Sequence, residues 1–119
     1  MKIIITATQD SLQAKVDPRF GRATFFCCYD MENNTAEFIP NEQALDSPAG
    51  AGIQAARTAA STGAQILITG HVGPKAFKAL SAVNMTIYFC QSNTVANAIN
   101  DYKNGKLEKA DQADVEGHW

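Results

Sequence analysis

The sequence is poor in cysteine, in long apolar runs and in charge of one sign. Its 119 residues include three cysteines, an odd and low number that argues against a disulfide framework and fits reduced thiols. The apolar runs, such as Ile3-Ile4-Ile5, are far too short to span a membrane or to form a signal peptide. Twelve acids and ten bases give a net charge of −2, so no global cationic field favours nucleic acid or anionic lipid. We therefore expect a cytoplasmic protein with no nucleic-acid and no membrane partner.

The length and composition favour one folded domain followed by a short tail. Hydrophobic residues make up 45% of the chain, which is enough for a core. Residues 106–119 hold four acids and two bases, whereas the preceding residues hold eight of each. Because this terminal stretch has no apolar periodicity, we predict a single domain over residues 1–107 and an acidic, mobile tail over 108–119.

The alternation of apolar runs and turn residues predicts a mixed sheet with helices on its faces. β-branched and aromatic runs predict strands, alanine-rich or proline-initiated stretches predict helices, and Gly, Asn and Pro mark the turns. The predicted strands are residues 2–7, 23–30, 36–40, 65–69 and 85–90, and the predicted helices are residues 50–61, 74–82 and 94–103. A hairpin followed by alternating helices and strands indicates an α/β domain.

The clearest candidate site is the turn Gly70-His71-Val72-Gly73-Pro74-Lys75. Here a strand ends and a helix begins, so free amide groups and the positive end of the helix favour an anion. His71 and Lys75 would add a ligand atom and a charge. A plain turn with a solvated His and Lys is the equally weighted alternative.

Two further segments are candidates for the same site. Gly50-Ala51-Gly52 opens a helix but lacks the residues of a Walker or dinucleotide motif, so a simple helix start is the favoured interpretation. Arg19-Phe20-Gly21-Arg22 places two arginine forks, which suit oxyanions and other polyanions, around an aromatic residue. The plainer interpretation of this segment is a loop with surface arginines and a buried Phe20.

The cysteines give little sign of a metal site. Cys27 and Cys28 are neighbours in a predicted strand, so their side chains point to opposite faces. Neither they nor Cys90 shows the spacing of a zinc site. Cys90 ends a strand near the candidate edge, so it stays open as a ligand. We also find no recognisable nucleophile, base or paired carboxylates, which argues against an enzyme.

Several short motifs follow one another along the chain, from Arg19-Phe20-Gly21-Arg22-Ala23 followed by Phe26, through Gly50-Ala51-Gly52, to Gly105-Lys106-Leu107. In this ordered set of motifs, the chain resembles the dinitrogenase iron–molybdenum cofactor biosynthesis family, that is, NifX-like proteins and the C-terminal domain of NifB-like proteins. The resemblance starts at Arg19-Phe20-Gly21-Arg22-Ala23 and runs to Gly105-Lys106-Leu107. Between them it includes Phe26, Asn41, Gly50-Ala51-Gly52, residues 63–70, Gly73, Ala76, Leu80, Ile87-Tyr88, Val95, Ala98-Ile99 and Tyr102. Many relatives carry His where this sequence has Arg19, and arginine pairs with anions rather than coordinating metals.

The resemblance implies a ribonuclease H-like, three-layer fold. Its five-stranded mixed sheet has the order 3-2-1-4-5, with strand 2 antiparallel. It also implies a small accessory protein that binds or carries an anionic metal–sulfur cluster of the molybdenum–iron type, or of the molybdenum–copper sulfide type found in orange proteins. Cluster-assembly proteins are then implied partners.

The predicted pocket combines the three glycine-containing segments, with His71 and Cys90 as candidate metal ligands. The cofactor-binding residues that we expect are Arg19, Phe20, Gly21, Arg22, Gly50, Gly52, Gly70, His71, Gly73 and Lys75. Two alternatives stay open. One is a hydrolase of a small phosphorylated substrate that uses the same glycine turns, and the other is a regulatory interaction module without a ligand.

Overall fold

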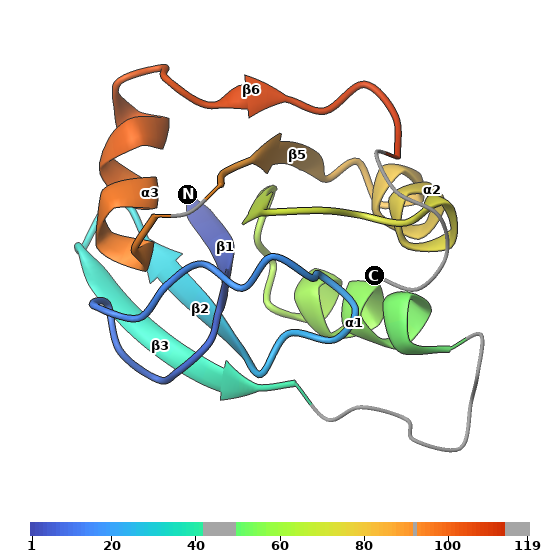
Figure 1. Ribbon diagram of the computed structural model, residues 1–119, viewed down its shortest axis with the longest axis horizontal. Coiled ribbons are helices and arrows are strands. Elements are labelled where there is room, and N and C mark those ends of the chain that lie inside the picture. Colours follow the sequence, from blue (N-terminus) through green and yellow to red (C-terminus); the bar gives the residue numbers. More distant parts are fainter. Residues whose placement is uncertain (42–49, 92, 114–119) are drawn as a thin grey trace.

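The computed structural model of the chain describes residues 1–41, 50–91 and 93–113 (Figure 1). The strands are β1 (Lys2–Ala7), β2 (Phe25–Asp30), β3 (Thr35–Pro40), β4 (Ile66–Thr69), β5 (Thr86–Phe89) and β6 (Glu108–Lys109). The helices are α1 (Ala51–Ser61), α2 (Pro74–Ala82) and α3 (Val95–Lys103). These bounds match the predicted elements to within two residues, except that β6 was not predicted.

The strands form one mixed sheet in the order β3-β2-β1-β4-β5-β6. β2 runs antiparallel to both β1 and β3, while β1, β4 and β5 run parallel to one another. The predicted order and the antiparallel second strand are therefore confirmed. The carboxyl ends of β1, β4 and β5 meet at one edge of the sheet, which is the edge that carries the turn after β4.

The sixth strand corrects the predicted five-stranded sheet. β6 pairs antiparallel with β5, and the amide of Ala110 donates to the carbonyl of Ile87 at 2.8 Å. The strand escaped sequence analysis because it has two residues, both with exposed side chains, and so has no periodic pattern. The division into a domain over 1–107 and a mobile tail over 108–119 stays a prediction, and residues 114–119 lie outside the described residues.

Two hydrophobic cores lie on opposite faces of the sheet. In β1, Ile4 packs with α1 and α2 on one face, whereas Ile3 and Ile5 pack with α3 on the other. This alternation is the period of a strand that is covered on both sides. The result is the three-layer arrangement expected of a ribonuclease H-like fold.

Small residues let the two helices of one face pack closely. A Cβ atom on Gly52 of α1 would lie 3.0 Å from the Cβ of Ala76 in α2. Ala55, Ala56 and Ala59 are the buried residues of α1, so this helix presents little side-chain bulk to its neighbours. No helix in the described ranges is both long and apolar enough to cross a membrane.

Candidate functional site

The segment that carries Arg19 and Phe20 lies alongside the turn that follows β4. Arg19 and His71 form an isolated parallel β-bridge, and the amide of Phe20 donates to the carbonyl of His71 at 3.2 Å. Gly70 makes this approach possible, because a Cβ atom there would lie 2.6 Å from the Cα of Pro18. The structure thus brings together two segments that the sequence separates by about fifty residues.

The third predicted segment joins the others through the first turn of α2. Gly50 and Gly73 are the N-cap residues of α1 and α2, and neither helix has a side-chain cap. A Cβ atom on Gly52 would lie 3.7 Å from the amide nitrogen of Ala76, so the start of α1 packs against the start of α2. The two glycine-initiated helices therefore begin near each other on one face of the sheet.

Unlike α1 and α2, α3 has a side-chain cap, and its first amides are paired as well. The amides of Val95 and Ala96 donate to the carbonyls of Ala14 and Leu12, and the Thr94 hydroxyl accepts from the amide of Asn97 at 3.1 Å. A helix start that is satisfied in this way has little left to offer an anion. This contrast favours the α1 and α2 side of the sheet for a ligand.

The side chains of the predicted site differ in exposure, and this separates their roles. Arg19, Arg22 and Lys75 are exposed, and His71 is half-buried. Phe20 is fully buried, with its ring centroid 5.8 Å from that of Phe26. Phe20 therefore anchors the loop from beneath, and the cations lie at the surface above it.

Asp17 lies in the candidate site, although the sequence analysis assigned it no role. Its side chain is buried, and its carboxylate accepts from the amides of Arg19 at 3.1 Å and Thr24 at 3.4 Å. The Nε atom of Arg19 lies 3.8 Å from the same carboxylate. The sequence contained a sign of the contact with Arg19, because an Asp side chain in a loop often accepts from the amide two residues later and so closes a turn.

The three cysteines are buried and are poor candidates for thiolate ligands. Burial raises the pKa of the Cys27 thiol to about 12 and also raises the pKa of Cys28 and of Cys90. Cys90 packs in the α3-side core, whereas Val72, the residue after His71, packs in the core of the opposite face. In the part of the chain that the structure describes, no three His, Cys, Asp or Glu residues are grouped so as to hold a metal ion.

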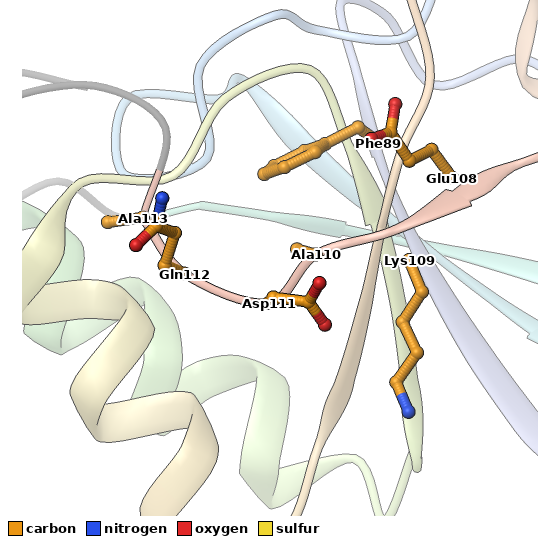
Figure 2. Close-up of a pocket in the computed structure, with 7 residues that line it drawn as sticks. All are labelled: Phe89, Glu108, Lys109, Ala110, Asp111, Gln112 and Ala113. Atoms are coloured by element: carbon orange, nitrogen blue, oxygen red, sulfur yellow. The ribbon is translucent and has the colours of Figure 1, made fainter.

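A pocket of about 240 Å³ lies at the neighbouring strand ends (Figure 2). Its lining residues are Phe89, Glu108, Lys109, Ala110, Asp111, Gln112 and Ala113. Phe89 pairs with Thr69, the residue before Gly70, so the pocket lies one strand away from the candidate turn. None of the predicted site residues lines it, and its two acids and one base do not favour an anion.

A model of the dinitrogenase iron–molybdenum cofactor family matches residues 1–105. The chain belongs to this family. The match covers every candidate site residue and ends before β6.

Solved structures of similar proteins have the same architecture. The apo form of the orange protein from Desulfovibrio gigas is 37% identical, with a TM-score of 0.91 and coverage of 96% of both chains. A Thermotoga protein proposed to be a NifB protein is 29% identical, with a TM-score of 0.82 and coverage of 98% of both chains.

The chain is also similar in sequence to an uncharacterized protein of Methanocaldococcus jannaschii. The two are 27% identical over 100 residues, which are 80% of this chain and 82% of the relative.

Proposed function

We propose that this protein is an accessory protein, not an enzyme, which binds and carries an anionic metal–sulfur cluster. The site is formed by Arg19–Arg22 and Gly70–Lys75, with Gly50–Gly52 beside them. The observation that carries the proposal is the pairing of Arg19 and Phe20 with His71, because it joins the cationic loop to the glycine turn. Membership of the family and the similarity to the orange protein support the same function.

Charge and hydrogen-bond donors are the chemistry that these residues offer to such a cargo. The exposed guanidinium groups of Arg19 and Arg22 and the ammonium group of Lys75 attract an anion. The N-terminus of α2, which begins at Pro74 after Gly73, adds a favourable dipole. The imidazole of His71 either coordinates a metal when neutral or pairs with an anion when protonated.

The cargo is of the molybdenum–iron or molybdenum–copper sulfide type in this proposal, as the resemblance to orange proteins and NifX-like proteins implies. The buried cysteines do not fit a thiolate ligand set, so the cluster is held mainly by charge. Cluster-assembly proteins are the proposed partners, and the reduced thiols fit a cytoplasmic location.

Binding of tetrathiomolybdate tests this function against the two alternatives. We expect anaerobically purified protein to bind this dianion, with an affinity that falls as salt rises because ionic attraction is screened over about 8–10 Å. Arg22→Ala should weaken binding about tenfold. Lys103→Ala is the matched control, since Lys103 lies on α3 over the Tyr29 ring.

The other outcomes separate the alternatives. Binding that ignores both salt and Arg22→Ala would contradict capture by charge. Binding of inorganic phosphate in preference to tetrathiomolybdate would favour the hydrolase. Absence of binding to either anion, together with no metal and no visible absorbance in the purified protein, would favour the ligand-free module.

A further inference from the structure

We propose that Asp17 is a positioning residue of this site, which holds the guanidinium of Arg19 in place for the anion. The inference rests on the proposed function. Asp17 does not reach the surface, since its exposed fraction is 3%. It acts through Arg19, whose side chain is 47% exposed.

The backbone of Asp17 is fixed to the sheet. Its amide donates to the carbonyl of Thr6 at 2.9 Å, and the Thr6 hydroxyl donates to the carbonyl of Asp17 at 2.8 Å. The same hydroxyl lies 2.8 Å from the hydroxyl of Thr69, so the residue that precedes Gly70 belongs to this network. Asp17 therefore has a defined position relative to the ends of both β1 and β4.

The carboxylate of Asp17 also fixes both ends of the segment Arg19–Arg22, which we call the arginine loop. One oxygen accepts from the amide of Arg19 and the other accepts from the amide of Thr24. Asparagine has the same shape but one acceptor oxygen, and its NH₂ group would face one of these two amides. A buried donor without an acceptor is costly, so Asp17→Asn should release one end of the loop.

Charge and positioning predict opposite effects of Asp17→Asn on the affinity for an anion, so a binding measurement distinguishes the two roles. Asp17→Asn removes a negative charge that lies 3.8 Å from the Arg19 guanidinium, so the site becomes more positive. If Asp17 only balanced charge, the variant would bind an anion more tightly. If Asp17 positions Arg19, the variant binds more weakly in spite of the added positive charge.

The experiment is a double-mutant cycle with tetrathiomolybdate as the probe. Wild type, Asp17→Asn, Arg19→Gln and the double variant are titrated over a range of salt concentrations. We expect Asp17→Asn to weaken binding about tenfold and to reduce the salt dependence as much as Arg19→Gln does. The double variant should bind no more weakly than Arg19→Gln alone, because both changes remove the same interaction.

Glu37→Gln is the matched control, because it removes one acid from the exposed part of the edge strand β3. It should leave both the affinity and the salt dependence unchanged. Unchanged or tighter binding by Asp17→Asn would overturn the proposal. A double variant whose loss of affinity equals the product of the two single losses would overturn it as well.

Amide hydrogen exchange tests the positioning role without any ligand. In Asp17→Asn, exchange at the amide of Arg19 or of Thr24 should accelerate at least about tenfold, while the Ala110 amide, which is bonded to Ile87, should not change. Equal protection in wild type and variant would overturn the role of Asp17. Faster exchange in a protein that binds no tetrathiomolybdate would refute the proposed function but leave Asp17 as the residue that positions Arg19.

Discussion

The backbone of Pro18 lies so close to Gly70 that a Cβ atom on the glycine would come within 2.6 Å of the Cα of Pro18 and 2.8 Å of its carbonyl oxygen. Both neighbours are backbone atoms, which cannot move aside as the end of a flexible side chain can. Gly70 is therefore the residue on which the contact between the arginine loop and the turn after β4 depends.

Gly70→Ala should lower the free energy of unfolding by about 1–3 kcal/mol, because the added methyl group overpacks this contact. Chemical shifts of Arg19, Phe20 and His71 should change as the two segments move apart. Urea denaturation and amide spectra measure the two effects. Gly63→Ala is the control, since Gly63 has open space around its Cβ position but a φ of +79°. It should cost about 1 kcal/mol through backbone strain alone and leave the site shifts unchanged.

His71→Ala and Cys90→Ala should have opposite effects on binding and on stability. His71 is half-buried beside Arg19. Its loss should therefore lower the affinity for tetrathiomolybdate several-fold, by no more than about tenfold, with little change in stability. Cys90 is 5% exposed in the α3-side core, so its loss should lower the free energy of unfolding and leave affinity unchanged. Loss of binding with Cys90→Ala alone would identify Cys90 as a ligand.

A variant in which both Cys27 and Cys28 are replaced by Val should keep its affinity for tetrathiomolybdate. Both thiols are buried, and burial raises their pKa, so neither is a ready thiolate at neutral pH. Ellman's reagent should react slowly with them in the native protein and rapidly after unfolding. Rapid native reaction, or loss of binding in the valine variant, would contradict this expectation.

The raised pKa of Cys27 should make the protein less stable in alkali. Burial raises this pKa from its ordinary value of 9.0 to about 12, so the folded state keeps a proton that the unfolded state loses. The stability contribution is complete below pH 9 and decreases as the pH rises toward 12. Urea denaturation of wild type and Cys27→Val between pH 8 and about 11 should show a steeper decrease in wild type. If the stability of wild type and of Cys27→Val fell equally with pH, the raised pKa of Cys27 would be contradicted.

Removal of β6 should destabilise the protein modestly. Deletion after Leu107 removes the pairing with β5 and the packing of Ala110 against the core, and we expect Tm to fall by about 4–8 °C for a loss of about 1 kcal/mol. Deletion after Ala113 should leave Tm unchanged, because it keeps β6 and Ala110. The composition instead predicts a mobile tail over residues 108–119, for which the deletion after Leu107 would leave Tm unchanged as well. Equal melting temperatures for the two truncations would mean that β6 adds nothing to stability.

Much of the fold could be predicted from local sequence patterns. The all-apolar run at residues 3–5 and the aromatic and cysteine run at residues 25–29 predict strands covered on both faces, and Pro74 marks the start of α2. Asn and Gly were expected to mark turns, and Asn34 and Gly105 both have positive φ values. These features depend on near neighbours in the chain, so the sequence carries them directly.

The parts that escaped prediction depend on contacts between distant residues. β6 forms because β5 offers an unpaired edge, not because Glu108 and Lys109 favour a strand. The spacing of Asp17 and Arg19 is typical of a turn that an Asp side chain closes. Nothing local shows that the same carboxylate is buried and also accepts from the amide of the more distant Thr24.

The sequence by itself determined the order of strands and helices, the glycine turns and the family resemblance, because these arise from local propensity and from short motifs. Only the tertiary structure decided that Phe20 lies beneath the candidate site, that Cys90 packs in the α3-side core, and that Arg19 meets His71. The physical reason is that burial and pairing depend on how the sheet brings separate segments together. Spacing along the chain does not contain that information.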